Sequence, residues 1–313
     1  MLSEKEIGAR RAPLSAPLQG ALYMIAAAFM FSIMNVAIRV AAETLDPLQI
    51  AFFRNVFALA FMLPWLYRAG LPGIHTKRLG THAWRAGLGF LAMVLWFYAV
   101  ALLPLAEAVA LNFTVPLFAT IGAALFLKEV VRARRWSATL VGFLGVLIVL
   151  RPGFAEVTLV TALPVIAALF MAASSLLVKS LARHESPAAI VLYMNLFLTP
   201  LSLVPALFVW RWPDLTALSM VVLVGGLAAV AHICLTRAYA KADASAVLPF
   251  DYARLPFVAA LAFIFFGQGV DIWTWVGAAV IAGSAIYIAH RETRMAAQGG
   301  SLPTTHRVPQ ERV

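Results

Sequence analysis

The sequence is poor in charge and almost free of cysteine. Asp, Glu, Lys and Arg make up only 12% of its 313 residues, about half the ~25% of soluble globular chains. So few charges cannot cover a water-facing surface. The single cysteine, Cys234, excludes an internal disulfide framework. An ordinary soluble domain and a disulfide-stapled one are therefore both excluded.

Several motifs of catalysis are also missing from the sequence. It contains no P-loop pattern, no HExxH zinc spacing and no GxSxG elbow, and each of these patterns is tied to a specific chemistry. No two carboxylates are paired on adjacent apolar segments. The sequence therefore predicts neither an ATPase nor an intramembrane enzyme, and it indicates no catalytic residue, metal site or cofactor.

Apolar residues are what the sequence has in excess, at 63% against ~45–50% in globular proteins. A helix of about 20 apolar residues crosses the bilayer core. Ten apolar stretches approach that length, at 20–40, 49–67, 83–103, 105–127, 136–150, 158–181, 188–210, 215–238, 244–266 and 272–289. Short turns such as Asp46-Pro47 join them. We expect an all-α membrane protein with ten transmembrane helices.

The basic residues predict the orientation. With the N-terminus placed in the cytoplasm, most of the 24 Lys and Arg residues, Arg85 included, fall on cytoplasmic connections, and only Arg39, Arg151 and Arg211 fall outside. Cytoplasmic loops of membrane proteins are enriched in Lys and Arg. We therefore expect a multi-pass protein of the cell membrane with both termini cytoplasmic. The net charge of +10 then needs no nucleic-acid partner.

The chain contains an internal repeat. A shift of 140 residues pairs Pro47 with Pro187 and Asn55 with Asn195, and Asn112 meets Asp251 within one residue of that shift. We expect two five-helix repeats, at 20–151 and 158–290, between an N-terminal tail at 1–19 and a disordered C-terminal tail at 291–313. An odd number of helices inverts the second repeat in the membrane. Inverted repeats are typical of secondary transporters with alternating access.

Five segments carry a family resemblance. They are Ile50 to Arg54, Asn112 to Phe118, Leu127-Lys128-Glu129, Trp136 to Gly145, and Pro249 to Pro256. In these segments the chain resembles ten-helix EamA-type members of the drug/metabolite transporter superfamily, although Gln268 replaces the usual glutamate. The resemblance implies transport of a small metabolite such as an amino acid, a nucleotide-like compound like S-adenosylmethionine, a vitamin like riboflavin, or a drug.

Ionisable side chains inside the predicted spans are candidates for the site, because an ionisable group in hydrocarbon is costly. Asp251 and Arg254 are three residues apart, on one helical face, in a span that Pro249 and Pro256 are expected to kink. They form either a substrate or proton site or an ion pair that only aids packing. Arg54 either snorkels to the outer headgroups or attracts a carboxylate or phosphate. His232 is either a proton relay or a packing residue.

Amides and aromatic residues complete the predicted site. Buried amides either tie helices together or line a pathway, and aromatic rings either stack on a planar ligand or occupy the membrane interface. Asp251 is the candidate for proton coupling. The predicted substrate-binding residues are Arg54, Asn55, Trp96, Asn112, Thr114, Tyr193, Asn195, His232, Asp251, Tyr252 and Arg254.

Small residues line the spans at 136–150 and 272–289, for example Gly142, Gly145, Ala279 and Gly283. Small residues let helices approach closely, so we expect packing surfaces within one chain or between the subunits of a homodimer. Taken together, the sequence predicts a secondary transporter in which one repeat rocks against the other around a small polar or amphipathic solute. The competing interpretation is a receptor or scaffold that binds a small ligand in the membrane without moving it.

Overall fold

A computed structural model of the chain describes residues 16–69, 76–126, 133–150, 158–241 and 247–299. Within these ranges the regular secondary structure is entirely helical. The elements are α1 (Ala16–Ala41), α2 (Pro47–Ala69), α3 (Leu79–Leu102), α4 (Leu105–Asn112), α5 (Val115–Phe126), α6 (Ala133–Leu150), α7 (Leu159–Ala182), α8 (Pro187–Phe208), α9 (Leu215–Lys241), the 3₁₀ helix η2 (Leu248–Ala253), α11 (Arg254–Phe266) and α12 (Ile272–Gly299).

Six of these helices are long and apolar enough to cross a bilayer: α1, α2, α3, α7, α8 and α9. Their ends follow local sequence signals. The side chain of Thr158 accepts a hydrogen bond from the backbone N–H of Thr161 at the start of α7. Ser186 caps α8 in the same way, and Pro187 occupies its first turn, where a missing N–H costs nothing.

The segment predicted as one helix at 105–127 is divided into α4 and α5, so the prediction of a single continuous helix is wrong. The hydroxyl of Thr114 donates to the carbonyl oxygen of Leu111 at 2.9 Å, and the N–H of Phe113 bonds to the carbonyl oxygens of Val109 and Ala110. Pro116 follows in the first turn of α5 and has no N–H to continue the ladder. The turn at 113–114 therefore separates the two helices.

The corresponding helix of the second repeat is also irregular. It begins as the 3₁₀ helix η2, which contains Asp251, and continues as α11 from Arg254. The helix type thus changes from 3₁₀ to α between Pro249 and Pro256, in the segment where the sequence predicts a kink. The two repeat mates Asn112 and Asp251 both lie where a helix is interrupted.

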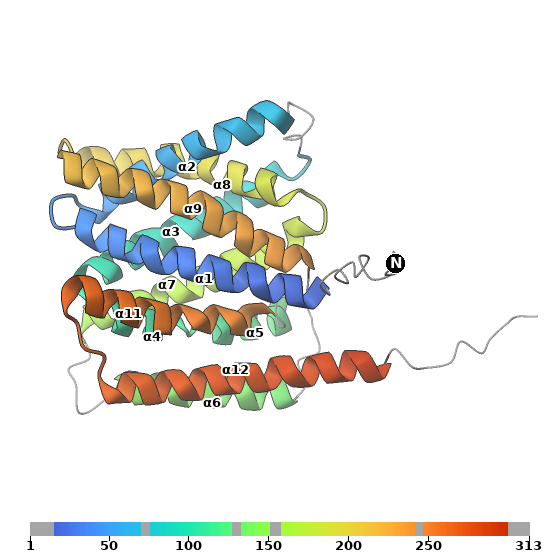
Figure 1. The fold of residues 1–313 in the computed structure, drawn as a ribbon. Coiled ribbons are helices and arrows are strands. Elements are labelled where there is room, and N and C mark those ends of the chain that lie inside the picture. The colour runs from blue at the N-terminus through green and yellow to red at the C-terminus, as the bar shows by residue number, and fades with distance from the viewer. Residues whose placement is uncertain (1–15, 70–75, 127–132, 151–157, 242–246, 300–313) are drawn as a thin grey trace, which may run out of the picture.

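Helices from the two halves of the sequence lie next to one another. α1 packs along α9, α3 along α7, and α2 against both α8 and α9. Contact with α9 is close at Gly225, where an added Cβ would lie 2.4 Å from Cβ of Phe57. α6 and α12 lie side by side at one edge of the bundle (Figure 1). The two segments predicted to carry packing surfaces, 136–150 and 272–289, thus lie against each other within one chain.

The distribution of side chains is that of a membrane protein. Large apolar residues such as Phe208 (86% exposed) and Leu159 (90%) face outward, whereas Gln49, Asn55 and Asn195 are buried. Extended apolar surface of this kind marks contact with lipid or a partner. Together with the six apolar helices, it identifies a multi-pass membrane protein.

The first residues of α1 and the last residues of α12 lie at the same end of the bundle (Figure 1). α12 continues to Gly299, ten residues beyond the predicted end of the span at 289. Residues 1–15 of the predicted N-terminal tail and residues 300–313 of the predicted C-terminal tail lie outside the described residues.

Candidate functional site

A cavity of about 170 Å³ lies between the two halves, and the unoccupied space reaches about 1050 Å³ when its open mouth is counted. Helices of both repeats line it, and both interrupted helices reach it through Asn112 and Asp251. The structure brings together six of the predicted site residues on its wall: Arg54, Trp96, Asn112, His232, Asp251 and Arg254.

The predicted pair of Asp251 and Arg254 is present. A guanidinium nitrogen of Arg254 lies 2.6 Å from a carboxylate oxygen of Asp251, and the guanidinium stacks over the ring of Phe31 at 4.9 Å. Asp251 is the only carboxylate among the described residues that line the cavity. The pair is therefore both an ion pair and part of the cavity wall.

Arg54 is turned into the cavity. Its side chain is 4% exposed, so it does not snorkel to a headgroup region. Nη1 donates to Oδ1 of Asn55 at 2.7 Å and contacts Sδ of Met93 at 3.5 Å. Asn55 in turn donates to Oγ of Ser202 at 3.1 Å and ties α2 to α8. Asn55 thus orients Arg54 and joins the repeats without lining the cavity.

Arg85 is a lining residue that the sequence interpretation missed, since it was counted among the cations of a cytoplasmic connection. It is 4% exposed, and it lies six residues inside α3. Its Nη1 donates to the carbonyl oxygen of Ile190 at 3.3 Å, and its Nε has no partner among the described residues. The spacing of His82 and Arg85 would have placed both on one helical face.

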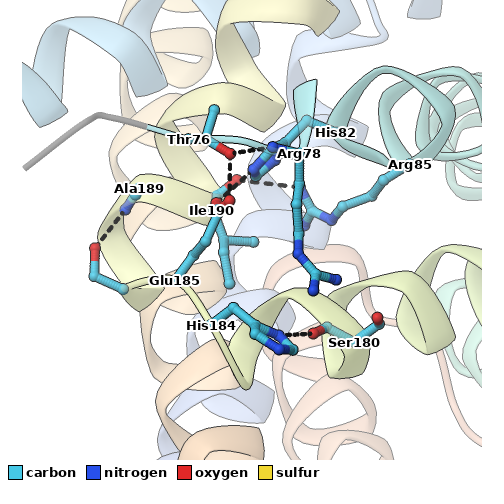
Figure 2. Close-up of polar contacts among 10 residues, drawn as sticks. Thr76, Arg78, His82, Arg85, Ser180, His184, Glu185, Ala189 and Ile190 are labelled. Carbon is cyan, nitrogen blue, oxygen red and sulfur yellow. Dashed lines mark hydrogen bonds and ion pairs between the residues drawn. The ribbon is translucent and has the colours of Figure 1, made fainter. Parts of the chain in front are cut away.

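One turn before Arg85 in α3, a polar cluster joins the two repeats (Figure 2). Nε2 of His82 lies 2.6 Å from one carboxylate oxygen of Glu185, in the turn between α7 and α8. The hydroxyl of Thr76 donates to the other oxygen. Tyr193 packs its ring against His82 at 4.7 Å. Tyr193 therefore supports this cluster, which we call the His82–Glu185 latch, and it is not a lining residue.

The opposite end of the bundle is joined by a different pair of segments. The side chain of Gln49, at the start of α2, donates to the carbonyl oxygen of Arg211 at 2.8 Å. It also accepts from the N–H of Arg211 at 3.1 Å. This contact again links the two repeats, but it involves neutral amide groups only.

Other parts of the cavity wall combine aromatic rings with a few amide groups. Nε1 of Trp96 donates to Oδ1 of Asn35 at 3.3 Å, and the ring of His232 meets Phe31 edge-on at 5.2 Å. Nδ2 of Asn112 donates to the carbonyl oxygen of Pro164 at 3.4 Å. Aromatic walls with a few placed polar groups are typical of sites for planar ligands.

Two further predicted residues bond within their own segments. Thr114 bonds to Leu111, and Nδ2 of Asn195 donates to the carbonyl oxygen of Val191 at 2.9 Å. Neither of them lines the cavity. The side chain of Tyr252 lies outside the described residues.

The sequence is similar to those of known transporters. The sequence profile of the EamA-like transporter family matches residues 18–151 and 159–289. A riboflavin transporter of Vibrio cholerae is 38% identical over 283 residues, which cover 89% of this chain and 95% of the relative. An S-adenosylmethionine uptake transporter of Rickettsia bellii is 29% identical over 250 residues, 80% of this chain and 86% of the relative.

A solved crystal structure shares the fold. It has a TM-score of 0.68 at 18% sequence identity, and the match covers 88% of this chain and 98% of the other.

Proposed function

This chain belongs to the EamA-like transporter family, and on that premise we propose that it carries a flat heteroaromatic metabolite of the riboflavin type by alternating access. It is a transporter of a small metabolite and not an enzyme. The observation that supports the proposed cargo is the central cavity, whose wall combines Trp96 and Phe31 with three arginines.

The proposed architecture is ten membrane crossings in two inverted repeats with both termini in the cytoplasm. α4 with α5 would form one crossing, and η2 with α11 another. The equivalent placement of these two interrupted helices supports an inverted repeat, because transporters of this kind build their midplane sites from discontinuous helices. The common end of α1 and α12 (Figure 1) supports an even number of crossings.

The charge of the cavity favours a riboflavin-type cargo over S-adenosylmethionine. Arg54, Arg85 and Arg254 face one carboxylate, that of Asp251, so the cavity has an excess of positive charge. The sulfonium centre of S-adenosylmethionine is cationic and would be repelled. The flavin ring offers carbonyl and imine acceptors along one edge, which suit guanidinium donors, and a broad π-face for Trp96.

The test is flux in proteoliposomes that contain the purified full-length chain. We expect riboflavin to enter these vesicles faster than it enters protein-free vesicles, and S-adenosylmethionine to enter both at the same rate. Riboflavin fluorescence gives the first rate and a radiolabel gives the second. If S-adenosylmethionine moves and riboflavin does not, the proposed cargo is wrong.

Proton coupling is a further part of the proposal, with Asp251 as the coupling group. Asp251 lines the cavity and is bonded to Arg254, so protonation of this carboxylate would release the arginine at the place where cargo binds. Coupling would then arise because the Asp251 carboxylate and the cargo compete for the same guanidinium, and a proton on the carboxylate removes that competition. The proposal applies to one partly buried pair and requires no other titratable group.

A further inference from the structure

Arg54 and Arg85 are two buried cations without a counter-charge among the described residues. Their hydrogen bonds to described residues go to an amide oxygen, a thioether sulfur and a backbone carbonyl oxygen. Each guanidinium has five N–H donors, and these three bonds use only a minority of them within the described part of the chain. A buried charge normally has a partner, because an uncompensated one costs several kcal/mol. The cavity therefore lacks the negative charge that these residues require.

The two arginines approach each other from opposite ends of the bundle. Arg54 lies seven residues from the start of α2 at Pro47, and Arg85 lies six residues from the start of α3 at Leu79. At 1.5 Å per residue each is about 10 Å deep. Both side chains line the same cavity, together with His232. A ligand in this cavity could therefore contact both arginines.

The other charges near the cavity do not compensate this pair. The carboxylate of Asp251 already pairs with Arg254, whose Nη2 lies 2.6 Å from Oδ1. Glu185, which contacts α3 one turn before Arg85, uses one oxygen for His82 and the other for Thr76, as Figure 2 shows. The unpaired Nε of Arg85 is buried on a residue that lines the cavity. Asp251 is the one carboxylate on the cavity wall among the described residues, so a ligand that enters the cavity can supply the negative charge.

We infer that Arg54 and Arg85 together form an oxyanion site inside the cavity, which binds a carboxylate or phosphate group of the cargo. Charge-assisted hydrogen bonds from arginine to such groups are stronger than neutral ones and are often bidentate. The site makes an anionic group on a flat metabolite a determinant of affinity, and it excludes cations. The inference rests on the proposed function for its flavin probes only.

The experiment compares two probes that share a ring and differ by one phosphate. Binding of riboflavin and of flavin mononucleotide to the purified chain in nanodiscs is followed by quenching of flavin fluorescence. We expect flavin mononucleotide to bind at least about tenfold more tightly, since its phosphate accepts charge-assisted hydrogen bonds that riboflavin cannot accept, and these are stronger than neutral ones. Arg54→Gln and Arg85→Gln should each reduce this ratio to about threefold or less. Arg211→Gln, at an exposed position, should leave it unchanged.

A second readout separates an anion site from a purely structural role. Removing an uncompensated buried charge relieves its desolvation cost, so Arg85→Gln should unfold at the same or a higher temperature without ligand. Inorganic phosphate or benzoate should raise the unfolding temperature of the parent chain but not that of the Gln variants. A variant that unfolds at a lower temperature and still responds to phosphate overturns the inference.

The outcomes also separate this inference from the proposed function. If flavin mononucleotide binds no more tightly than riboflavin, or keeps its advantage in both Gln variants, the oxyanion site is wrong even when riboflavin is transported. If neither flavin binds but phosphate or benzoate stabilises the chain through the two arginines, the flavin-type cargo is wrong and the oxyanion site stands. If no oxyanion stabilises the chain, the oxyanion site is wrong.

Discussion

Breaking the His82–Glu185 latch should open one end of the transporter. In Glu185→Gln the side chain keeps its size and can still accept from Thr76, but it loses its charge. The N–O distance of 2.6 Å joins α3 of the first repeat to the α7–α8 turn of the second. Rocking one repeat against the other must separate such a contact at one end of the bundle. The substitution therefore favours the state in which that end is open.

The size of the effect follows from burial. His82 is fully buried and the side chain of Glu185 is 9% exposed, so the ~0–1 kcal/mol of an exposed ion pair does not apply. A hydrogen bond to a charged group contributes ~1.5–3 kcal/mol. Each 1.4 kcal/mol changes an equilibrium tenfold. Loss of the latch should therefore raise the population of the open state by about 10- to 150-fold.

A cysteine reporter in the cavity measures this population. Ser174 lines the cavity, and its hydroxyl donates to the carbonyl oxygen of Arg85 at 3.5 Å. Ser174→Cys is introduced together with Cys234→Ala, and a membrane-impermeant maleimide is added from the side of the latch. Glu185→Gln should raise the labelling rate at least about tenfold.

The control is Glu43→Gln, which removes a carboxylate from the exposed turn between α1 and α2. That turn lies at the end closed by Gln49 and Arg211, so labelling from the latch side should not change. The reasoning is refuted if Glu185→Gln labels at the parent rate, or if Glu43→Gln accelerates labelling to the same extent.

Three further substitutions test packing, coupling and cargo contact. Gly225→Ala should lower the unfolding temperature, because the new Cβ would lie 2.4 Å from a side chain of α2 and 3.0 Å from its backbone, and overpacking costs ~1–3 kcal/mol. Gly226→Ala should lower the unfolding temperature less, because its new Cβ would meet only the ring of Phe61, at 3.0 Å. Equal shifts in the two variants would contradict the close contact at Gly225. Asp251→Asn should abolish any stimulation of riboflavin uptake by a pH gradient, and equal stimulation in the variant and the parent would remove the coupling role. Trp96→Phe should keep the affinity for riboflavin within about threefold and Trp96→Ala should weaken it by about tenfold, because an aromatic contact contributes ~0.5–1.5 kcal/mol beyond area burial. A fluorescence titration measures both affinities. Equal affinities in Trp96→Ala and the parent chain would show that the indole does not contact the flavin ring.

The sequence could predict those site residues that are ionisable and lie within an otherwise apolar stretch. Arg54, Asp251 and Arg254 are ionisable residues within apolar stretches, and the cost of burying them pointed to a cavity or a partner. Arg85 was missed because it lies only two residues after the predicted start of its span, at 83, and was counted with the cations of the preceding connection, where a basic residue needs no explanation. In the structure α3 starts at Leu79, so Arg85 lies deeper in the helix than predicted.

The contacts between repeats could not be predicted, because they depend on which helices become neighbours. Nothing in the sequence near His82 indicates Glu185, which follows about a hundred residues later. The same holds for Gln49 and Arg211. Asn55 could be read as a helix tie or as a lining residue, and only the position of Ser202 in space shows that it ties α2 to α8.

The pairing of α1 with α9 has a consequence for synthesis. Among the described elements, α1 packs more extensively with α9 than with any other helix, yet α9 is translated long after it. During synthesis α1 is therefore surrounded by lipid until α9 (Leu215–Lys241) has been inserted. Such non-local pairing slows folding and leaves intermediates exposed. A chain that stops after the first repeat would therefore leave α1 without its main neighbour and would be a substrate for membrane quality-control proteases.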